Sequence, residues 1–135
     1  MRKEEQRVWD TMKRNAPADL WMERVENMVG DGMPDLWIGA RRHCWVELKA
    51  AKMPKRATTP LLGADGLRTS QTNWHRKARA RNLPVYTLTR DDQGGLYLVS
   101  CEHSDELNAM PAAVMAQHSI ASNWVDIFKE LTREN

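Results

Sequence analysis

With 135 residues, 41% of them hydrophobic, the chain is long enough for one compact domain over residues 1–135, and it lacks the apolar run of roughly 20 residues that a membrane helix needs. Its first residues are charged, unlike a signal peptide, and two cysteines are too few for a disulfide-rich secreted fold, so we expect a cytoplasmic protein without an organic cofactor. Residues 40–81 hold eleven Lys or Arg and two acidic residues, a charge of +9 against −7 elsewhere, which favours a polyanion-binding face, although a solvated surface would give the same pattern.

The first half of the chain alternates between helical and extended patterns. Val8, Trp9 and Met12 are spaced to share one helical face, which predicts a helix over residues 3–14 that ends before Pro17. Extended segments are expected at 20–28, 35–38 and 43–50, and residues 39–42 connect the last two as a hairpin. The segment 52–66 is rich in Pro, Thr, Gly, Lys and Arg, which predicts a mobile basic loop.

The second half predicts a helix over 69–81, with Thr69 or Ser70 as its N-cap, and a hairpin of strands at 85–90 and 94–100. The tail, 101–135, has a helical pattern with an apolar stripe that is one candidate dimer surface, formed by Trp124, Ile127, Phe128 and Leu131. This order predicts an α/β fold: a small mixed β-sheet flanked by helices over about residues 1–100, followed by a C-terminal helical extension.

The chemically informative residues are Asp35, in Gly32-Met-Pro-Asp, and the later Glu47-Leu-Lys49. Residues two apart in a strand project from the same face, so Glu47 and Lys49 emerge side by side, and the hairpin folds Asp35 back towards them. Carboxylate oxygens suit Mg²⁺ or Mn²⁺, with Asp35 and Glu47 as ligands and the Leu48 backbone carbonyl as a third. Lys49 would orient a water or offset transition-state charge.

Pro34-Asp35 with Glu47-Leu48-Lys49 resembles the PD-(D/E)XK nuclease signature. The longer string, Arg24-Val-Glu-Asn, Gly32-Met-Pro-Asp-Leu, Trp45-Val-Glu-Leu-Lys, Leu67-Arg68, Gln71 and Trp74-His75, is similar to its VRR-NUC branch, known from Fanconi-associated nucleases and stand-alone phage and bacterial proteins. The resemblance implies a restriction-endonuclease-like core, an acidic residue on the first helix (Glu5, or else Glu4), and Gln71 at the rim of the metal site. It also implies branched DNA such as Holliday junctions as substrate, and a homodimer.

Further residues are assigned by charge and position. Candidate DNA contacts lie in the basic loop and on the 69–81 helix: Lys52, Lys55, Arg56, Arg68, His75, Arg76, Lys77 and Arg79. For His75, a satisfied polar residue is an equal alternative. Glu26 is a weak site candidate, and it would equally pair with a neighbouring arginine. The spacing of His43, Cys44, Cys101 and His103 does not favour a zinc site.

These observations predict a divalent-metal-dependent, structure-selective endodeoxyribonuclease with Glu5, Asp35, Glu47, Lys49 and Gln71 in its active site. Shape is favoured over base sequence as its determinant, because no recognition helix is evident. Two alternatives remain open: a non-catalytic DNA-binding module that keeps the basic face, and a restriction-like enzyme that cuts at defined sequences.

Overall fold

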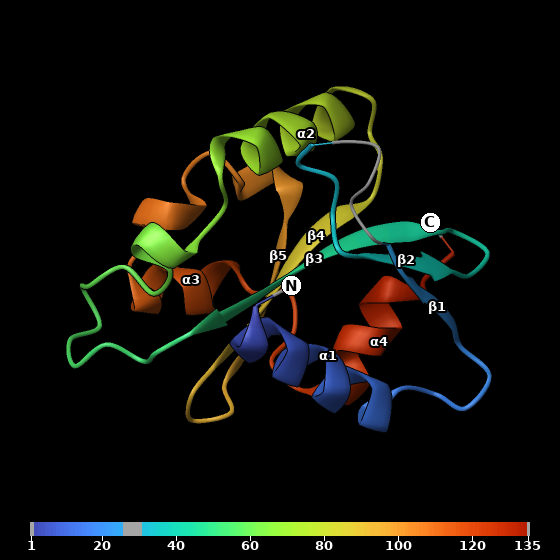
Figure 1. Cartoon of the computed structure of the whole chain (residues 1–135), viewed down its shortest axis with the longest axis horizontal. Coiled ribbons are helices and arrows are strands. Elements are labelled where there is room, and N and C mark those ends of the chain that lie inside the picture. The colour runs from blue at the N-terminus through green and yellow to red at the C-terminus, as the bar shows by residue number, and fades with distance from the viewer. Residues whose placement is uncertain (1, 26–30, 135) are drawn as a thin grey trace.

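The computed structural model describes residues 2–25 and 31–134 (Figure 1). The chain runs through the helices and strands in the order α1 (Lys3–Asn15), β1 (Trp21–Arg24), β2 (Leu36–Gly39), β3 (Cys44–Ala51), α2 (Thr69–Ala80), β4 (Val85–Asp91), β5 (Leu96–Ser100), α3 (Ala112–His118) and α4 (Trp124–Leu131). Short 3₁₀ turns are η1 (Gly63–Asp65), η2 (Cys101–His103) and η3 (Leu107–Ala109). The predicted order of elements is confirmed.

The five strands form one mixed sheet in the order β1-β2-β3-β4-β5. Strands β3 and β4 are parallel, and the other neighbouring pairs are antiparallel. Helix α2 lies between β3 and β4 in the chain, as a parallel pair requires, because the chain must return to the same end of the sheet. The predicted α/β fold, a small mixed sheet flanked by helices, is therefore confirmed.

One face of the sheet carries the main hydrophobic core. Val46 and Leu48 of β3 point to this face and are fully buried, as the alternation in the strand requires. Helix α1 covers them with Val8, Trp9 and Met12, which share one side of the helix as predicted. Helix α4 lies beside α1 on the same side of the sheet, whereas α2 lies on the other side (Figure 1).

The prediction of a mobile basic loop over residues 52–66 is wrong for its second part. Leu61 and Leu62 are buried in a second hydrophobic cluster with Tyr97 and Val99 of β5 and with Met115 of α3. The Leu61 N–H donates to the Met110 carbonyl, so the segment is held by backbone hydrogen bonds as well as by packing. The two leucines within a Pro- and Gly-rich stretch are the physical reason for the difference.

Two further expectations about local structure are corrected. Helix α2 has Arg68 as its N-cap, not Thr69 or Ser70, and the Gln71 side chain accepts a hydrogen bond from the Arg68 N–H at 2.9 Å. Strand β1 ends at Arg24, whereas the predicted strand continued to residue 28; residues 26–30, with the weak candidate Glu26, lie outside the described residues.

No helix in the described part of the chain is both long and apolar enough to span a membrane.

The apolar stripe of α4 is not a dimer surface. Ile127, Phe128 and Leu131 are buried in the main core, so this face is already covered by the protein itself. The exposed apolar residue of this helix is Val125, which lies next to the stripe and lines a surface groove together with Phe128.

Phe128→Ala should therefore lower the free energy of unfolding by about 3–5 kcal/mol, because it removes a buried aromatic ring and leaves a cavity. Val125→Ala, at a site with 68% of its surface exposed, should change it by less than about 0.5 kcal/mol. Urea unfolding followed by circular dichroism measures both. A Phe128 variant that keeps wild-type stability but loses self-association would contradict the buried placement.

Candidate active site

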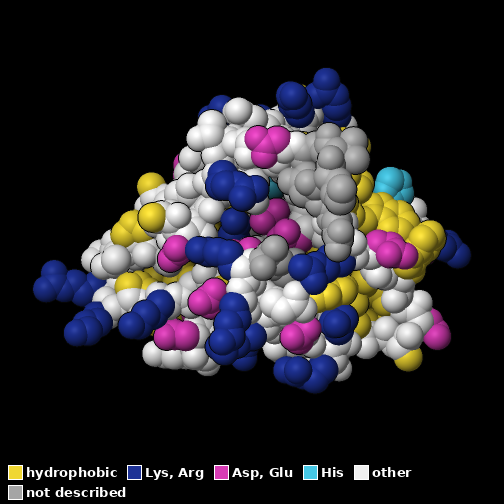
Figure 2. Space-filling model, in the orientation of Figure 1, with side chains coloured by type: hydrophobic (Ala, Val, Ile, Leu, Met, Phe, Trp, Pro, Cys, Tyr) yellow, Lys and Arg dark blue, Asp and Glu magenta, His cyan; other side chains and the backbone are white. Residues whose placement is uncertain are grey.

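A cavity of about 700 Å³ opens where the N-termini of α1 and α2 approach β3. Figure 2 shows acidic side chains inside this hollow and Lys and Arg side chains around it. Its lining includes the five predicted catalytic residues together with residues of the turn η1: Arg2, Glu5, Met33, Asp35, Glu47, Lys49, Ala64, Asp65, Gly66, Arg68 and Gln71.

Three carboxylates converge at this cavity from distant parts of the sequence. Glu5 comes from the first turn of α1, Asp35 from the residue before β2, and Glu47 from the middle of β3. One oxygen of each lies within 4.8 Å of the others, and both glutamates are buried. Glu4 is exposed, so Glu5 is the residue of the first helix that reaches the site. The three groups form the kind of oxygen-rich cluster that binds a hard divalent cation.

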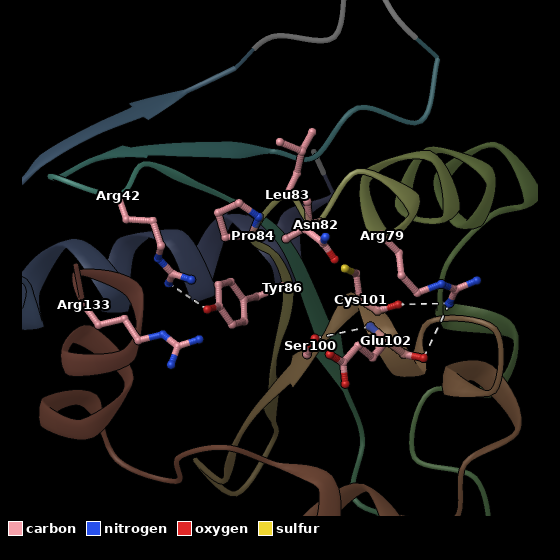
Figure 3. A pocket seen from close by; sticks show the side chains of 11 residues that line it. Arg42, Arg79, Asn82, Leu83, Pro84, Tyr86, Ser100, Cys101, Glu102 and Arg133 are labelled. Carbon is pink, nitrogen blue, oxygen red and sulfur yellow. Dashed lines mark hydrogen bonds between the residues drawn. The ribbon is translucent and has the colours of Figure 1, made fainter. Parts of the chain in front are cut away.

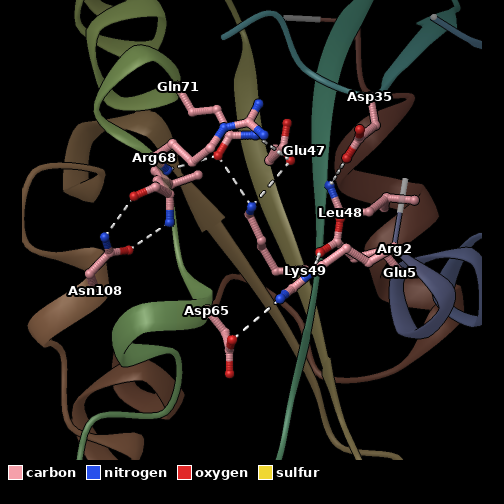
Figure 4. Close-up of polar contacts among 11 residues, drawn as sticks. Arg2, Glu5, Asp35, Glu47, Leu48, Lys49, Asp65, Arg68, Gln71 and Asn108 are labelled. Atoms are coloured by element: carbon pink, nitrogen blue, oxygen red, sulfur yellow. Dashed lines mark hydrogen bonds and ion pairs between the residues drawn. The ribbon is translucent and has the colours of Figure 1, made fainter. Parts of the chain in front are cut away.

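Two features of the backbone position Asp35: a hydrogen bond from β3 and a tight turn before β2. Its Oδ2 accepts a hydrogen bond from the Leu48 N–H at 2.9 Å, which ties the start of β2 to the middle of β3 (Figure 4). Gly32, in the preceding turn, has a φ of +86°, and a Cβ at this position would lie 2.1 Å from the Ser70 carbonyl oxygen. Glycine is therefore required for the turn to pack against the start of α2 and deliver Asp35 to the cavity.

Lys49 and Gln71 form a buried network with Glu47 (Figure 4). The Lys49 amino group donates to Gln71 Oε1 at 3.2 Å and lies 3.6 Å from Glu47 Oε2. The Gln71 amide donates to the same glutamate oxygen at 3.1 Å. Since Gln71 also caps α2, one amide fixes both the helix and the lysine. The network orients the Lys49 amino group at the cavity beside the three carboxylates.

The cavity is electrostatically suited to a cation. Burial and the nearby charge of Asp35 hold the pKa of Glu47 well above its ordinary value, although Lys49 acts in the opposite direction. Glu47 Oε1 is buried and lacks a hydrogen-bond partner among the described residues. An unpartnered buried carboxylate oxygen is costly unless something positive binds it. The donor set therefore fits a divalent metal ion.

Arg2 is a site residue that was not predicted. Its guanidinium pairs with Glu5 Oε2 at 2.9 Å and with Asp65 Oδ1 at 3.3 Å, so it bridges α1 and η1 across the cavity. The i, i+3 spacing of Arg2 and Glu5 is a signal that could have suggested this contact. Leu48 lies where predicted, with its side chain in the core and its backbone beside Asp35; a metal contact through its carbonyl stays a prediction.

The prediction that His75 contacts DNA is wrong. Its side chain is fully buried, and its Nδ1 hydrogen-bonds to the Ser104 hydroxyl at 2.7 Å. Burial, with help from the charges of Lys49 and Arg79, lowers the pKa of His75 to about 4. His75 is therefore a neutral core residue that joins α2 to the segment after η2.

The predicted basic contacts fall into three groups. Arg68 lines the cavity, whereas Lys52, Lys55 and Arg56 are exposed on the segment that follows β3. Lys77 is exposed on α2. Arg76 and Arg79 both pair with Asp105, at 2.8 and 3.2 Å, and these bonds, that of Arg76 above all, lower the pKa of the aspartate. These two arginines are thus partly neutralised within the protein.

A second cavity, of about 360 Å³, lies at the start of β4 (Figure 3). Arg42 and Arg79 lie on its two sides, but both already donate hydrogen bonds within the protein: Arg42 to the Tyr86 hydroxyl, and Arg79 to the Cys101 carbonyl.

Cys44 and Cys101 are buried thiols. Among the described residues, the group of possible metal ligands is Glu5, Asp35 and Glu47, and it includes neither cysteine.

Comparison with known proteins supports the fold. No protein-family model matches the chain, and no curated protein matches its sequence. Among solved structures, the chain is similar to Hjc, a Holliday junction resolvase from the hyperthermophilic archaeon Archaeoglobus fulgidus, with a TM-score of 0.57 and 14% sequence identity. The match covers 92% of this chain and 97% of that one. The fold implied by the resemblance in the sequence is therefore confirmed over nearly the whole chain.

The burial of His75 should make stability depend on pH. Above its unfolded pKa of about 6.5, the imidazole is neutral in both states; between that value and about 4, the unfolded chain takes up a proton that the folded protein does not. This contribution is present above about pH 6.5 and is lost as the pH falls. Between about pH 7.5 and pH 4.5, wild type should lose about 2–3 kcal/mol more stability than His75→Gln in urea unfolding. Equal losses in the two proteins would contradict the buried neutral form.

Proposed function

We propose that this protein is a divalent-metal-dependent, structure-selective DNA endonuclease that hydrolyses phosphodiester bonds in branched DNA such as Holliday junctions. The observation that carries the proposal is the convergence of Glu5, Asp35 and Glu47 within 4.8 Å, beside the amino group of Lys49. The likeness of the fold to a Holliday junction resolvase supports it. A basic surface around an acidic cavity adds the charge complementarity that a DNA substrate needs (Figure 2).

The three carboxylates would hold the metal ion, with the Leu48 carbonyl as a further ligand. When bound at such a site, Mg²⁺ or Mn²⁺ stabilises negative charge on the phosphate and lowers the pKa of a water. The buried Glu47 Oε1 supports this assignment, because a cation would supply an interaction that none of the described residues provides. Asp35 is positioned for the same task by the Leu48 N–H.

Lys49 would act on the phosphate rather than on the metal. Its amino group is held by Gln71 and Glu47, so it is oriented before substrate arrives and can stabilise charge that develops on the phosphate oxygens or orient the attacking water. Gln71 would position Lys49 and Glu47 relative to each other through its amide. Attack of a water oxygen on phosphorus breaks the bond to the leaving sugar oxygen, which must then gain a proton.

DNA would lie over the cavity and its basic rim. Arg68 lines the cavity and would contact the scissile strand, with Lys52, Lys55, Arg56 and Lys77 further out. Arg2 also lines the cavity but pairs with Glu5 and Asp65, so we expect a smaller contribution from it. Arg76 and Arg79 share Asp105, so we expect smaller contributions from them. Each phosphate neutralised should add about −0.9 to the slope of log affinity against log salt concentration.

The finer assignments follow from the resemblance in the sequence. The string Gly32–Asp35, Trp45–Lys49 and Gln71 supports the VRR-NUC branch, and we propose a cytoplasmic homodimer, since two cuts across a junction need two active sites. The buried stripe of α4 is not available as the dimer surface.

Cleavage is tested on labelled linear, flap and four-way DNA, with Mg²⁺ or Mn²⁺ and with EDTA. We expect cuts in the branched substrates with metal and none with EDTA. Asp35→Ala and Lys49→Ala should each lower turnover by at least ~100-fold while junction binding persists, because Asp35 would hold the metal ion and Lys49 would act on the reacting phosphate. Lys129→Ala, at an exposed position on α4, is the matched control and should cleave like wild type. Binding without cleavage by wild type would favour a non-catalytic module, and discrete plasmid fragments a sequence-specific enzyme.

Metal binding is tested separately by titration calorimetry with Mn²⁺. Asp35→Asn should weaken binding by at least about tenfold, since it removes one anionic ligand without changing shape. Asp10→Asn removes an acidic side chain of α1 that lies outside the cavity, and this variant should bind Mn²⁺ as wild type does. Equal affinities for wild type and Asp35→Asn would exclude Asp35 as a ligand.

A further inference from the structure

Four of the six tryptophans follow one another on one face of the structure: Trp21 of β1, Trp37 of β2, Trp45 of β3 and Trp74 of α2. Trp37 and Trp45 are opposite each other in the register of β2 and β3. The ring centres are 4.7 Å apart for Trp21 and Trp37, and 5.9 Å apart for Trp45 and Trp74. We call these four residues the tryptophan strip.

The strip leaves the core at its β1–β2 end, whereas Trp45 and Trp74 are half-buried against Ala78, Val85 and Cys101. The side chains that alternate with it along β2 and β3, such as Leu36 and Val46, point to the other face and are fully buried. In contrast, 58% of the surface of Trp21 is exposed, and Trp37 is half-buried. Figure 2 shows hydrophobic side chains gathered on the surface over β1 and β2, beside a histidine. An exposed tryptophan that packs against a half-buried one offers an aromatic surface for binding.

Local structure prepares these rings for contact through their faces. A Cβ on Gly39 would lie 2.6 Å from the Trp37 ring and 2.8 Å from the Trp21 ring, so glycine is what lets both rings lie across the strand. The indole N–H groups already have partners, since Trp21 donates to Glu23 and Trp37 to His43. What the two side chains still offer is their aromatic surface.

The strip continues directly from the carboxylate cluster. Trp37 is two residues after Asp35, and Trp45 is two residues before Glu47, so each tryptophan shares a sheet face with a site carboxylate about 7 Å along its strand. On α2, Lys77 and Arg81 follow Trp74 at i+3 and i+7 and are exposed, which places positive charge beside the aromatic surface.

We propose that the tryptophan strip stacks a nucleobase whose face is exposed at a branch point of the DNA, and thereby selects substrates with unstacked bases; the inference rests on the proposed function. In a paired duplex, bases cover one another's faces, so the strip has nothing to stack on. A base already outside the stack reaches it without the cost of unstacking. A second copy of the chain fits less well, because the charged and exposed Glu23 and Arg24 protect the edge strand β1 from pairing.

The test measures binding in EDTA, so that catalysis does not enter. The probes are a splayed duplex with 2-aminopurine at the first unpaired position and a fully paired duplex of the same length. Trp21→Ala should weaken binding to the splayed DNA by about tenfold, reduce the change in 2-aminopurine fluorescence, and leave paired-duplex binding within about twofold. Gly39→Ala should weaken splayed-DNA binding in the same way, because it displaces both rings without removing them. Ile120→Ala, another exposed apolar side chain, should change neither.

Three results would overturn the inference. The first is a Trp21 variant that binds splayed DNA like wild type, and the second is an equal loss on both DNAs. The third is a change in the sedimentation of the DNA-free protein on Trp21→Ala, which would make the strip a contact between copies. If wild type binds splayed DNA through the strip but does not cleave in Mg²⁺, the proposed nuclease activity fails and the stacking surface stands. If it cleaves and Trp21→Ala binds and cleaves equally well, the reverse holds.

Discussion

Mutual repulsion among three carboxylates is the constraint around which the site is built. Their oxygens lie within 4.8 Å of one another and both glutamates are buried, an arrangement that is unfavourable for free anions. The protein offsets part of the cost with Lys49 beside Glu47, Arg2 beside Glu5, and the Leu48 N–H on Asp35. The rest of the cost remains in the raised pKa of Glu47 and in its Oε1, which has no hydrogen-bond partner in the described part of the chain, and this makes the cavity receptive to a cation.

The main core lies on one face of the sheet, and the cavity with its carboxylates lies on the other, beside two smaller hydrophobic clusters. Burial of Val46 and Leu48 under α1 and α4 anchors β3, and the alternation of the strand then sends Glu47 and Lys49 to the other face with little freedom to move. Helix α2 covers part of that second face and contributes Gln71 and the buried His75. The remainder, over β1 and β2, carries aromatic side chains next to the site. A rigid core on one side thus presents the carboxylate cavity and an aromatic surface on the other.

Much of the fold followed from local patterns. Apolar spacing in α1, alternation in β3 and the turn residues between strands predicted the elements and their order correctly, because each of these signals acts within a few residues. The errors have a common origin. The segment around Leu61, the buried His75 and the α4 stripe were misjudged because their burial depends on partners far away in the chain: β5 and α3, Ser104, and the main core.

The sequence alone determined which chemistry was available. It contains the carboxylates and the lysine in their order, and the glycine that the turn before Asp35 requires. Strand geometry alone then places Glu47 and Lys49 on the same face. Only the tertiary structure decided which acid of the first helix joins them, that Arg2 spans the cavity, and that four separate tryptophans form one surface. Those outcomes depend on how α1, η1 and α2 pack against the sheet, and such long-range packing leaves no periodic trace in the chain.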